Sequence, residues 1–344
     1  MIPLSVCIPT YNRASYLANA LKSVFAQPAV SRGEVEVLVC DNASPDDTET
    51  VASQYLKYKN FKYIKNPQNI GFDGNMQKAF ACAGGRYCLA MGDDDIMLEG
   101  ALDYLLEKIK TDFDFYLLSF GICYDGTKHT DSFVYLKNVK DGAVFDMGKK
   151  EDILKYLKSV KFNAGLFGYI GGFAVKRDVW NQIPLNPKVM GSGWIHIYNM
   201  WYLKNFGCKF CFLERPLINM RMQNDEIIKR KGWVSRLLME YKGLYELSAM
   251  LFDKDEELRL AFLSVVKDYL PPYSIPPLFA VPSSQKKAFE ELVAYARLYP
   301  YPQKFKDSLT SPLRLNPLYF VRAFLNMRCM RGVKKAVLKL RGLL

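Results

Sequence analysis

The first 120 residues alternate between short apolar runs and longer segments in which apolar residues are spaced among polar ones. Each run has four to six residues rich in β-branched, aromatic or cysteine side chains, and most stop at a proline, a glycine or an aspartate. This is the pattern of buried strands bounded by turns. Strands are therefore predicted at residues 4–8, 35–40, 61–64, 87–90 and 115–120, and a similar run follows at 210–213.

The segments between these runs have the periodicity of helices. From Leu17 to Val24 the apolar residues recur at i, i+3, i+4 and i+7, and Asn12 or Ser15 is the expected N-cap. Further helices are predicted at about 45–58, 75–83 and 98–110. Strands that alternate with helices of this length indicate βαβ units, so we expect an α/β fold with a mostly parallel sheet flanked by helices.

The pattern changes in the second half of the chain. Residues 125–150 are polar and mixed, which is typical of loops or hairpins, and residues 221–225 form another polar loop. Beyond about Glu226 the apolar spacing is helical, with proline-rich interruptions. We therefore expect residues 1–225 to form one α/β domain and residues 226–344 to form a helical extension.

Positive charge is concentrated in this extension. The chain has 47 Lys and Arg against 35 Asp and Glu, a net charge of +12, and residues 226–344 contribute 21 − 11 = +10 of it. After Asp307 there are eight Lys or Arg, no acid, and two apolar stripes at helical spacing within residues 316–344. Basic amphipathic helices bind anionic membranes, so peripheral membrane contact is expected; the alternative is a docked helix with a solvated basic face. No sequence-reading motif accompanies the charge, so no nucleic-acid partner is expected.

The cysteines and the hydropathy indicate the compartment. Several of the eight cysteines lie inside strand-like runs, where a thiol acts as a small apolar side chain, and the Cys208/Cys211 pair has no second pair to complete a zinc site. No signal-peptide pattern opens the sequence, and no stretch of about 18 apolar residues is present. A reducing, cytoplasmic location is expected.

Polar side chains follow three of the predicted strands, at Thr10–Arg13, Asp41–Ser44 and Asp93–Asp95. The carboxyl ends of parallel strands lie at one edge of a sheet, where open α/β sheets bind their ligands, so these clusters should converge. Three adjacent carboxylates repel one another and cannot all be buried without a counter-charge. Mg²⁺ or Mn²⁺ would supply that charge, and the alternative is a solvated acidic turn.

Four motifs in this order and spacing resemble the family 2 glycosyltransferases with the GT-A fold, a Rossmann-like sheet flanked by helices. The resemblance covers about residues 3–225, and the branch that looks most similar is the abequosyltransferase-like one of O-antigen and capsule synthesis. The motifs are Pro9-Thr-Tyr-Asn-Arg13, Asp41-Asn-Ala-Ser44, Asn69-Ile-Gly71 and Gly92-Asp-Asp-Asp95.

The resemblance implies a nucleotide-sugar donor, a divalent metal and inversion at the anomeric carbon. Thr10, Tyr11 and Arg13 would line the nucleotide. Asp41 would accept a hydrogen bond from the base, unless it caps the following helix. Asn69 would orient its loop or the donor, unless it is only a turn residue before Gly71.

The same resemblance assigns the acidic triplet and one arginine. Asp93 would face the ribose or sugar. Asp95 and Asp93 would be the metal ligands, and Asp95 is the first choice for direct coordination of Mn²⁺ or Mg²⁺. Asp94 would lie at the metal end of the triplet, as a donor-binding and candidate catalytic residue. The metal there would offset the negative charge that grows on the leaving nucleoside diphosphate. Arg221 would touch the diphosphate.

The general base is where the sequence departs from the family. The family places an acid after a Gly-Gly segment, at the start of a helix, whereas Gly171-Gly172 is followed by a predicted helix that begins Trp194-Ile-His196. His196 is the candidate replacement, since imidazole titrates near neutral pH. Three roles stay open for it: general base, metal ligand or buried structural histidine.

We therefore expect an inverting glycosyltransferase that acts on a hydroxyl of a lipid-linked glycan in cell-surface polysaccharide synthesis. It would work in the cytoplasm, peripherally on the inner face of the membrane. The alternative is a non-catalytic subunit that keeps the fold and binds a glycan or a nucleotide. The intact acidic triplet argues against that alternative.

Overall fold

The computed structural model describes residues 2–124, 131–222, 224–270, 275, 281–303, 306 and 309. The chain divides into two compact units, Met1–Asn224 and Asp225–Leu344. The boundary lies next to the one expected at residue 225. Residues 316–344, for which a membrane-binding helix was expected, lie outside the described residues.

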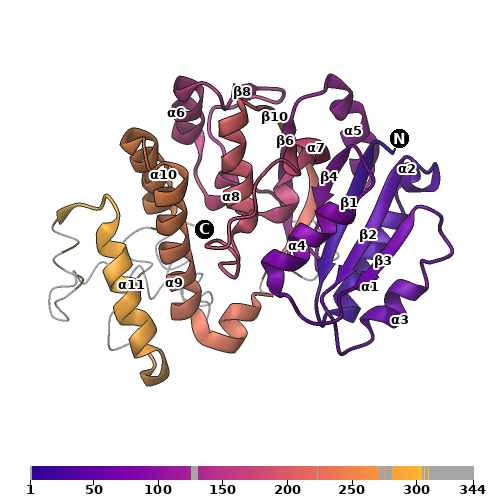
Figure 1. The fold of residues 1–344 in the computed structure, drawn as a ribbon, viewed down its shortest axis with the longest axis horizontal. Helices are drawn as coiled ribbons and strands as arrows, with labels where there is room; N and C mark the ends of the chain where they lie inside the picture. The colour runs from indigo at the N-terminus through magenta and orange to yellow at the C-terminus, as the bar shows by residue number, and fades with distance from the viewer. Residues whose placement is uncertain are drawn as a thin grey trace, which may run out of the picture. The chain divides into compact units, whose positions relative to one another are not determined.

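The first unit is built on a ten-stranded sheet with the main order β3-β2-β1-β4-β9-β6-β10-β5 (Figure 1). Six strands run in one direction: β1 Leu4–Thr10, β2 Val35–Asp41, β3 Phe61–Lys65, β4 Tyr87–Ala90, β6 Phe115–Cys123 and β10 Lys209–Arg221. The other four strands pair antiparallel to them: β5 Ile96–Met97, β7 Asp131–Ser132, β8 Val144–Asp146 and β9 Phe173–Lys176. The mostly parallel sheet is confirmed.

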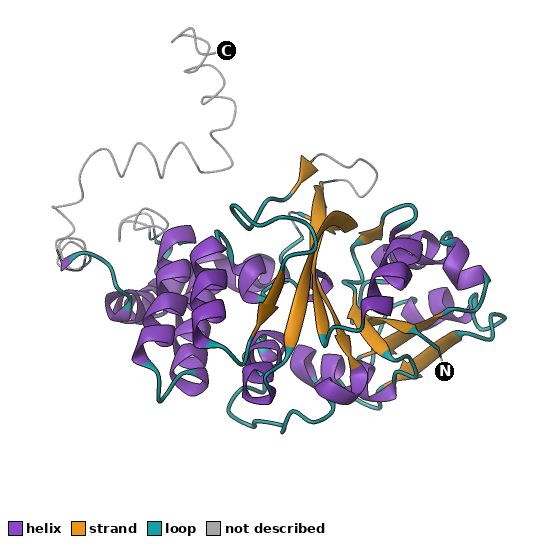
Figure 2. Ribbon diagram, turned by 90° about the horizontal axis from the view of Figure 1, so that it is seen from above, coloured by secondary structure: helices purple, strands orange, loops and turns teal. Residues whose placement is uncertain are grey.

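Helices of the first unit lie on both sides of this sheet (Figure 2). Their bounds are α1 Ala14–Phe25, α2 Pro28–Ser31, α3 Thr48–Ser53, α4 Gly71–Cys82, α5 Ala101–Lys108, α6 Lys150–Ser159, α7 Arg177–Trp180 and α8 Ile195–Tyr202. The expected periodicity holds in α1, where Leu17, Ala20, Leu21 and Val24 are fully buried. Burying such a stripe against the sheet is what stabilises a helix of this length.

Three boundaries differ from the sequence prediction. Helix α3 ends at Ser53 and does not reach Tyr58, and α4 begins at Gly71 in what the sequence suggested was a turn. Strand β10 does not stop at Leu213 but continues to Arg221, and its pairing with β6 shifts register between Leu213 and Ile218. Pro216 lies inside that shift, where its missing N–H does not interrupt the ladder.

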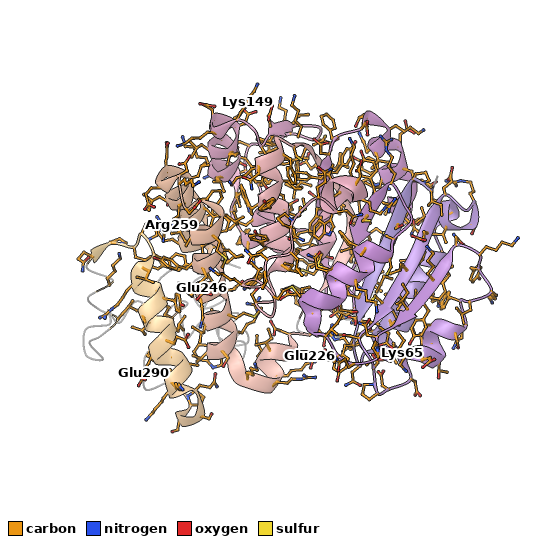
Figure 3. All side chains as sticks on the ribbon, viewed as in Figure 1. Lys65, Lys149, Glu226, Glu246, Arg259 and Glu290 are labelled. Carbon is orange, nitrogen blue, oxygen red and sulfur yellow. The ribbon has the colours of Figure 1, made fainter. Side chains whose placement is uncertain are left out.

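The described part of the second unit is helical, as expected: α9 Glu226–Leu251, α10 Glu256–Tyr269 and α11 Lys286–Leu298. Gly232 interrupts α9 with φ +80°, and Gln285 Oε1 accepts a hydrogen bond from Val234 N just after the break. Polar contacts join the helices: Glu246 accepts a bond from the Tyr295 hydroxyl, and the Arg259 guanidinium lies 5.1 Å from the Tyr245 ring centroid (Figure 3). Among the described residues, no helix has the length and apolar character needed to cross a bilayer.

Candidate functional site

The acidic triplet, Asp93–Asp95, follows β4 at the edge of the sheet where β1 and β2 also end. Gly92 introduces it in tight contact with two of the carboxylates. A Cβ atom at Gly92 would lie 2.6 Å from Asp95 Oδ2 and 3.2 Å from Asp94 Oδ1. Those two oxygens therefore lie so close to the Gly92 backbone that no side chain fits at position 92, which explains the glycine.

Asp93 is held by the loop that follows β1. The Thr10 hydroxyl donates to Asp93 Oδ2 at 2.8 Å, and Arg13 Nη1 donates to Asp93 Oδ1 at 3.0 Å. Only 5% of Asp93 is exposed. The structure thus joins the first and third predicted clusters, while Tyr11, between these two donors in sequence, stays partly exposed.

Asp94 receives cationic and amide donors from both ends of the first unit's sequence. Arg13 Nη1 lies 3.1 Å from Asp94 Oδ2, and Asn224 Nδ2 donates to the same oxygen at 2.7 Å. Arg221 Nε donates to the Asp94 backbone carbonyl at 3.0 Å, and its guanidinium lies 5.1 Å from the Tyr16 ring centroid. Arg221, for which the family resemblance implies a diphosphate contact, therefore lies beside the triplet.

Asp95 is the more deeply enclosed of the two acids expected to bind metal, with 3% of it exposed. The Tyr169 hydroxyl donates to Asp95 Oδ2 at 2.7 Å, and the Arg221 backbone N–H donates to Oδ1 at 3.0 Å. Each oxygen of a carboxylate has two lone pairs, so both can still bind a cation.

The electrostatics of the triplet favour a bound cation. Burial raises the pKa of Asp93 to about 6, although the Arg13 guanidinium opposes this shift. Burial also raises the pKa of Asp95 to about 7. The nearby charge of Asp94 adds to both shifts. Carboxylate oxygens suit Mg²⁺ and Mn²⁺. Within the described part of the chain, no group of three or more His, Cys, Asp or Glu is arranged so that it could hold a metal ion.

Asp41 and Asn69 belong to a neighbouring polar cluster. Asp41 is fully buried, and it accepts hydrogen bonds from Ser44 N at 2.9 Å and from the Tyr63 hydroxyl at 2.7 Å. Asn69 Oδ1 accepts from Asn42 Nδ2 at 2.9 Å, so it holds its loop against the end of β2. Asp41 makes its contacts inside the Asp41–Ser44 turn and with β3, not as the N-cap of α3, whose capping residue is Asp47.

His196 lies in the first turn of α8, away from the triplet's hydrogen bonds. Its Nε2 is 3.4 Å from the Gly168 carbonyl oxygen, and its Nδ1 has no partner among the described residues. Because a carbonyl only accepts, this contact assigns the proton to Nε2 and the lone pair to Nδ1. Burial lowers the pKa of His196 to about 4, so the ring is neutral at pH 7.

An acid does reach the start of α8, but it comes from α4. Asp73 Oδ2 accepts from Gly193 N at 2.9 Å, and Oδ1 accepts from Ile195 N at 3.3 Å. Asp73 is 2% exposed, and burial raises its pKa although these N–H groups oppose the shift. Asp73 therefore accepts hydrogen bonds from backbone N–H groups at the start of α8 that have no partner within the helix.

Sequence reasoning missed three residues that hold the site together. Tyr169 contacts Asp95, Asn42 connects the Asn69 loop to β2, and Tyr16 lies beside the Arg221 guanidinium. In the Tyr169-Ile-Gly-Gly172 segment, the two glycines are the part that matches a family motif. No local pattern identifies these contacts, because each joins residues from separate elements.

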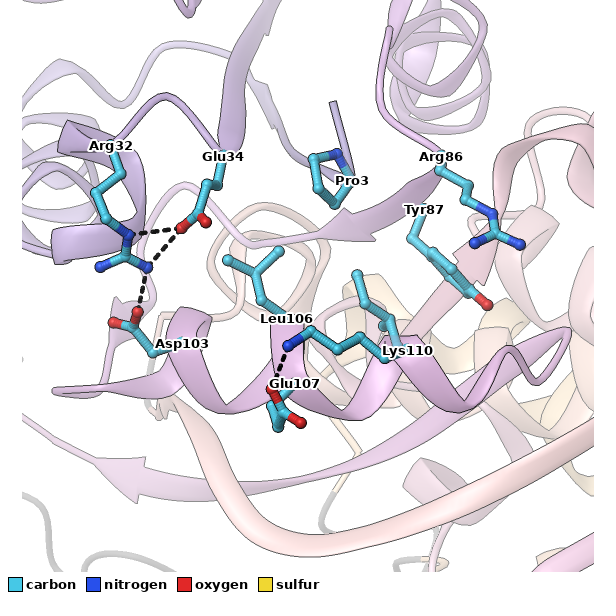
Figure 4. Close-up of a pocket in the computed structure, with 10 residues that line it drawn as sticks. Pro3, Arg32, Glu34, Arg86, Tyr87, Asp103, Leu106, Glu107 and Lys110 are labelled. Atoms are coloured by element: carbon cyan, nitrogen blue, oxygen red, sulfur yellow. Dashed lines mark hydrogen bonds and ion pairs between the residues drawn. The ribbon is translucent and has the colours of Figure 1, made fainter. Parts of the chain in front are cut away.

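A hollow of about 300 Å³ lies at the opposite, amino end of β1 and β4 (Figure 4). Its charged groups neutralise one another: Arg32 pairs with Glu34 and Asp103, and Lys110 pairs with Glu107. These ion pairs are exposed, and nothing in the hollow matches the buried, negatively charged carboxyl end.

Comparisons with known proteins agree with this geometry. The model of the family "Glycosyl transferase family 2" matches residues 5–181. Abequosyltransferase RfbV of Salmonella typhimurium is 28% identical over 272 residues, which cover 76% of this chain and 79% of that protein. The GalNAc(5)-diNAcBac-PP-undecaprenol beta-1,3-glucosyltransferase of Campylobacter jejuni is 36% identical over 126 residues, 36% of this chain and 38% of that protein.

Among solved structures, residues 1–349 of S. aureus TarS in complex with UDP-GlcNAc superpose with a TM-score of 0.61 at 16% identity. The match covers 89% of this chain and 83% of that chain. At this identity the likeness establishes the fold alone.

Proposed function

Because the chain belongs to glycosyl transferase family 2, in its abequosyltransferase-like branch, and has the GT-A fold, we propose that it is a metal-dependent, inverting glycosyltransferase. It moves a sugar from a nucleotide-sugar donor to a hydroxyl of a glycan. The observation that carries the proposal is the buried triplet with Asp93 and Asp95 of raised pKa at the carboxyl edge of the sheet. A donor diphosphate with its cation completes that charge balance.

The donor is held by the residues already gathered at this edge. Asp95 and Asp94, whose oxygens both lie close to the Gly92 backbone, would bind the Mn²⁺ or Mg²⁺. When bound, the cation stabilises the negative charge of the leaving nucleoside diphosphate. Both oxygens of Asp93 are engaged, one by Thr10 and one by Arg13, so we propose Asp94 rather than Asp93 as the second metal ligand beside Asp95.

The nucleotide base and diphosphate have separate partners. Tyr11 lies at the end of β1, where its partly exposed ring is available to the nucleotide. Asp41 Oδ1 accepts from both Ser44 N and Ser44 Oγ, and Oδ2 accepts from the Tyr63 hydroxyl, so one lone pair on Oδ2 is left for a further bond from a base. Arg221, whose guanidinium lies beside Asp94, supplies positive charge to the diphosphate.

His196 is the proposed base for the acceptor hydroxyl. Its Nδ1 carries the lone pair, and the Gly168 carbonyl orients the ring through Nε2. A pKa of about 4 makes it a weak base, so it accepts the proton as the bond to the anomeric carbon forms rather than before. The product sugar is inverted because the hydroxyl attacks opposite the leaving diphosphate.

The proposed acceptor is a lipid-linked glycan at the inner face of the cytoplasmic membrane. The name of the Campylobacter relative includes a PP-undecaprenol acceptor, and the basic run after Asp307 suits an anionic surface. Removal of residues 316–344 should release the protein from anionic vesicles and reduce transfer to a lipid-linked acceptor more than donor hydrolysis. Equal co-sedimentation of full-length and truncated protein would contradict membrane binding by this segment.

A non-catalytic binding subunit is the second candidate, because the acid at the start of α8 is engaged by backbone N–H groups and His196 is a weak base. One experiment separates the two. The full chain is screened by thermal shift against nucleoside diphosphates with and without Mn²⁺, since a ligand of the folded state raises its melting temperature. The matching nucleotide-sugars are then tested for release of nucleoside diphosphate. Binding without release, with or without a glycan acceptor, would contradict the enzyme.

A further inference from the structure

Tyr169 connects the Gly171-Gly172 segment to the acidic triplet. Its hydroxyl donates to Asp95 Oδ2 at 2.7 Å, and both residues are buried. The ring folds back over Gly171, where a Cβ atom would lie 2.7 Å from the hydroxyl oxygen and 2.8 Å from Cζ. No side chain fits at that distance, so the glycine lets the Tyr169 hydroxyl reach Asp95.

Two separate elements fix the orientation of the Asp95 carboxylate. Tyr169 donates to Oδ2, and the last residue of β10, Arg221, donates its backbone N–H to Oδ1 at 3.0 Å. The Tyr169 ring packs on Phe120 of β6 with ring centroids 4.4 Å apart, so it cannot turn without disturbing the core. One donor on each oxygen sets the plane of the carboxylate and leaves lone pairs for a cation.

The adjacent residue supports His196. The Gly168 carbonyl lies 3.4 Å from His196 Nε2, and a Cβ atom on Gly168 would lie 2.7 Å from the Asn163 carbonyl oxygen. One short segment thus contacts both the carboxylate expected to bind metal and the histidine proposed as base.

We propose that Tyr169 is a positioning residue that holds Asp95 in the orientation in which it binds the divalent cation of the donor complex. The proposal rests on the metal-dependent function proposed above. Hydrogen-bond partners of metal ligands typically contribute about 10–100-fold to metal affinity, because the ligand is already oriented before the ion binds. Loss of the hydroxyl frees the carboxylate to rotate, while the ring still fills its place in the core.

The chain supplies a matched control in Tyr135. Its hydroxyl is also buried and donates to the Leu118 carbonyl at 2.8 Å, and its ring also stacks on Phe120, with centroids 5.6 Å apart. Tyr135→Phe therefore removes the same group from the same aromatic cluster without touching Asp95. A general loosening of this cluster would affect both variants alike.

The test is Mn²⁺ affinity, measured on the full chain with free Mn²⁺ followed by electron paramagnetic resonance. The protein is saturated with the nucleoside diphosphate, among UDP, CDP, GDP and dTDP, that gives the largest Mn²⁺-dependent thermal shift. Tyr169→Phe should raise the Mn²⁺ concentration for half-saturation by about 10-fold or more, and Tyr135→Phe should leave it within about 2-fold of wild type. Excess Mn²⁺ should restore most of the transfer activity of Tyr169→Phe.

The outcomes separate the two proposals. Equal Mn²⁺ affinity of Tyr169→Phe and wild type, or equal weakening in both tyrosine variants, would overturn the positioning role and leave the proposed function intact. If the wild type binds no Mn²⁺ with any of the four diphosphates, the metal-dependent function itself is overturned, and the role of Tyr169 with it.

Discussion

Buried acidic side chains lie at both ends of β1, β2 and β4, but their pKa values shift in opposite directions. At the amino end, Glu36 is 2% exposed and receives Ser5 Oγ at 2.5 Å, Gly84 N at 2.7 Å and the Lys62 ammonium at 2.5 Å. Burial acts to raise the pKa of Glu36, but these three partners outweigh it and leave the pKa lowered. The ionised form of Glu36 is therefore stable at this position without a further ligand.

At the carboxyl end, burial and repulsion between the carboxylates outweigh the hydrogen bonds, and the pKa values of Asp93 and Asp95 are raised. The Arg13 guanidinium pairs with the Asp93 and Asp94 carboxylates, whereas the Arg221 guanidinium donates to the Asp94 backbone carbonyl. The fold thus compensates the buried Glu36 fully, and it leaves Asp93 and Asp95 incompletely compensated, at some expense in stability. The donor complex proposed above would supply the missing positive charge through its cation.

Asp95→Asn should have the largest effect on activity and should separate function from stability. Transfer should fall by at least about 10²–10³-fold, because a ligand of the charge-stabilising cation is lost. The melting temperature at pH 8 should equal or exceed that of wild type, since an acid whose folded pKa is raised destabilises the folded state above that pKa. Full wild-type activity in excess EDTA would rule out the metal assignment.

His196→Ala should lower the rate of transfer by about 10²–10⁴-fold and leave Mn²⁺-dependent nucleotide binding unchanged. Because burial lowers the pKa of His196 to about 4, the ring stays neutral between pH 5.5 and 7.5, and the wild-type profile should show no inflection from it in that range. Loss of Mn²⁺-dependent binding in the variant would make His196 a metal ligand. A lower melting temperature with unchanged kinetics would make it structural.

Glu36→Gln should lower the stability of the fold and leave the transfer activity per folded molecule unchanged, the reverse of what is expected for Asp95→Asn. It replaces a carboxylate oxygen that accepts two donors, so the free energy of unfolding at pH 7 should fall by about 1–3 kcal/mol. The folded pKa of Glu36 is lowered, so its contribution is present above the unfolded value of about 4.3 and is lost as the pH falls below it. Urea unfolding at pH 7 and pH 4 should therefore show a smaller difference at pH 4. A selective loss of activity per folded molecule would undermine the contrast.

Arg32→Ala should have the smallest effect. The side chains of Arg32, Glu34 and Asp103 around the amino-end hollow are 48%, 45% and 38% exposed, and ion pairs this exposed to solvent stabilise the fold only weakly. Transfer should be unchanged. Arg13→Ala, the matched arginine at the other end, should weaken Mn²⁺-dependent nucleotide binding, because its side chain is 21% exposed and contacts two triplet carboxylates. Similar binding by both variants would remove the distinction between the two ends.

Much of the site follows from the sequence because strand direction is a local property. Thr10, Arg13 and the triplet each follow a strand with a clear apolar pattern, and parallel strands bring their carboxyl ends together. The hydrogen bonds from Thr10 and Arg13 to Asp93 agree with that expectation. The helical extension was likewise readable from its spacing, as far as the structure describes it.

Local patterns were less informative where a distant group replaces the expected neighbour. Asn12 and Ser15 were the expected caps of α1, yet its N-cap is Arg13, which makes no side-chain capping bond, and Ala14 N donates to Asp46 Oδ2 at 2.9 Å. Strand β10 continues past Pro216 because the register shift absorbs the proline. In both cases a tertiary contact satisfies a backbone requirement that sequence neighbours usually meet.

The sequence by itself determined the α/β alternation, the parallel sheet and the edge at which the acids gather, because these depend on apolar periodicity and on strand polarity. Only the tertiary structure decided how each acid is held. Tyr169 reaches Asp95 across 74 residues, and Asp73 reaches Gly193 across 120. Such contacts leave no periodic trace in the chain, since one hydrogen bond between distant residues needs only two suitable side chains and the packing that brings them together.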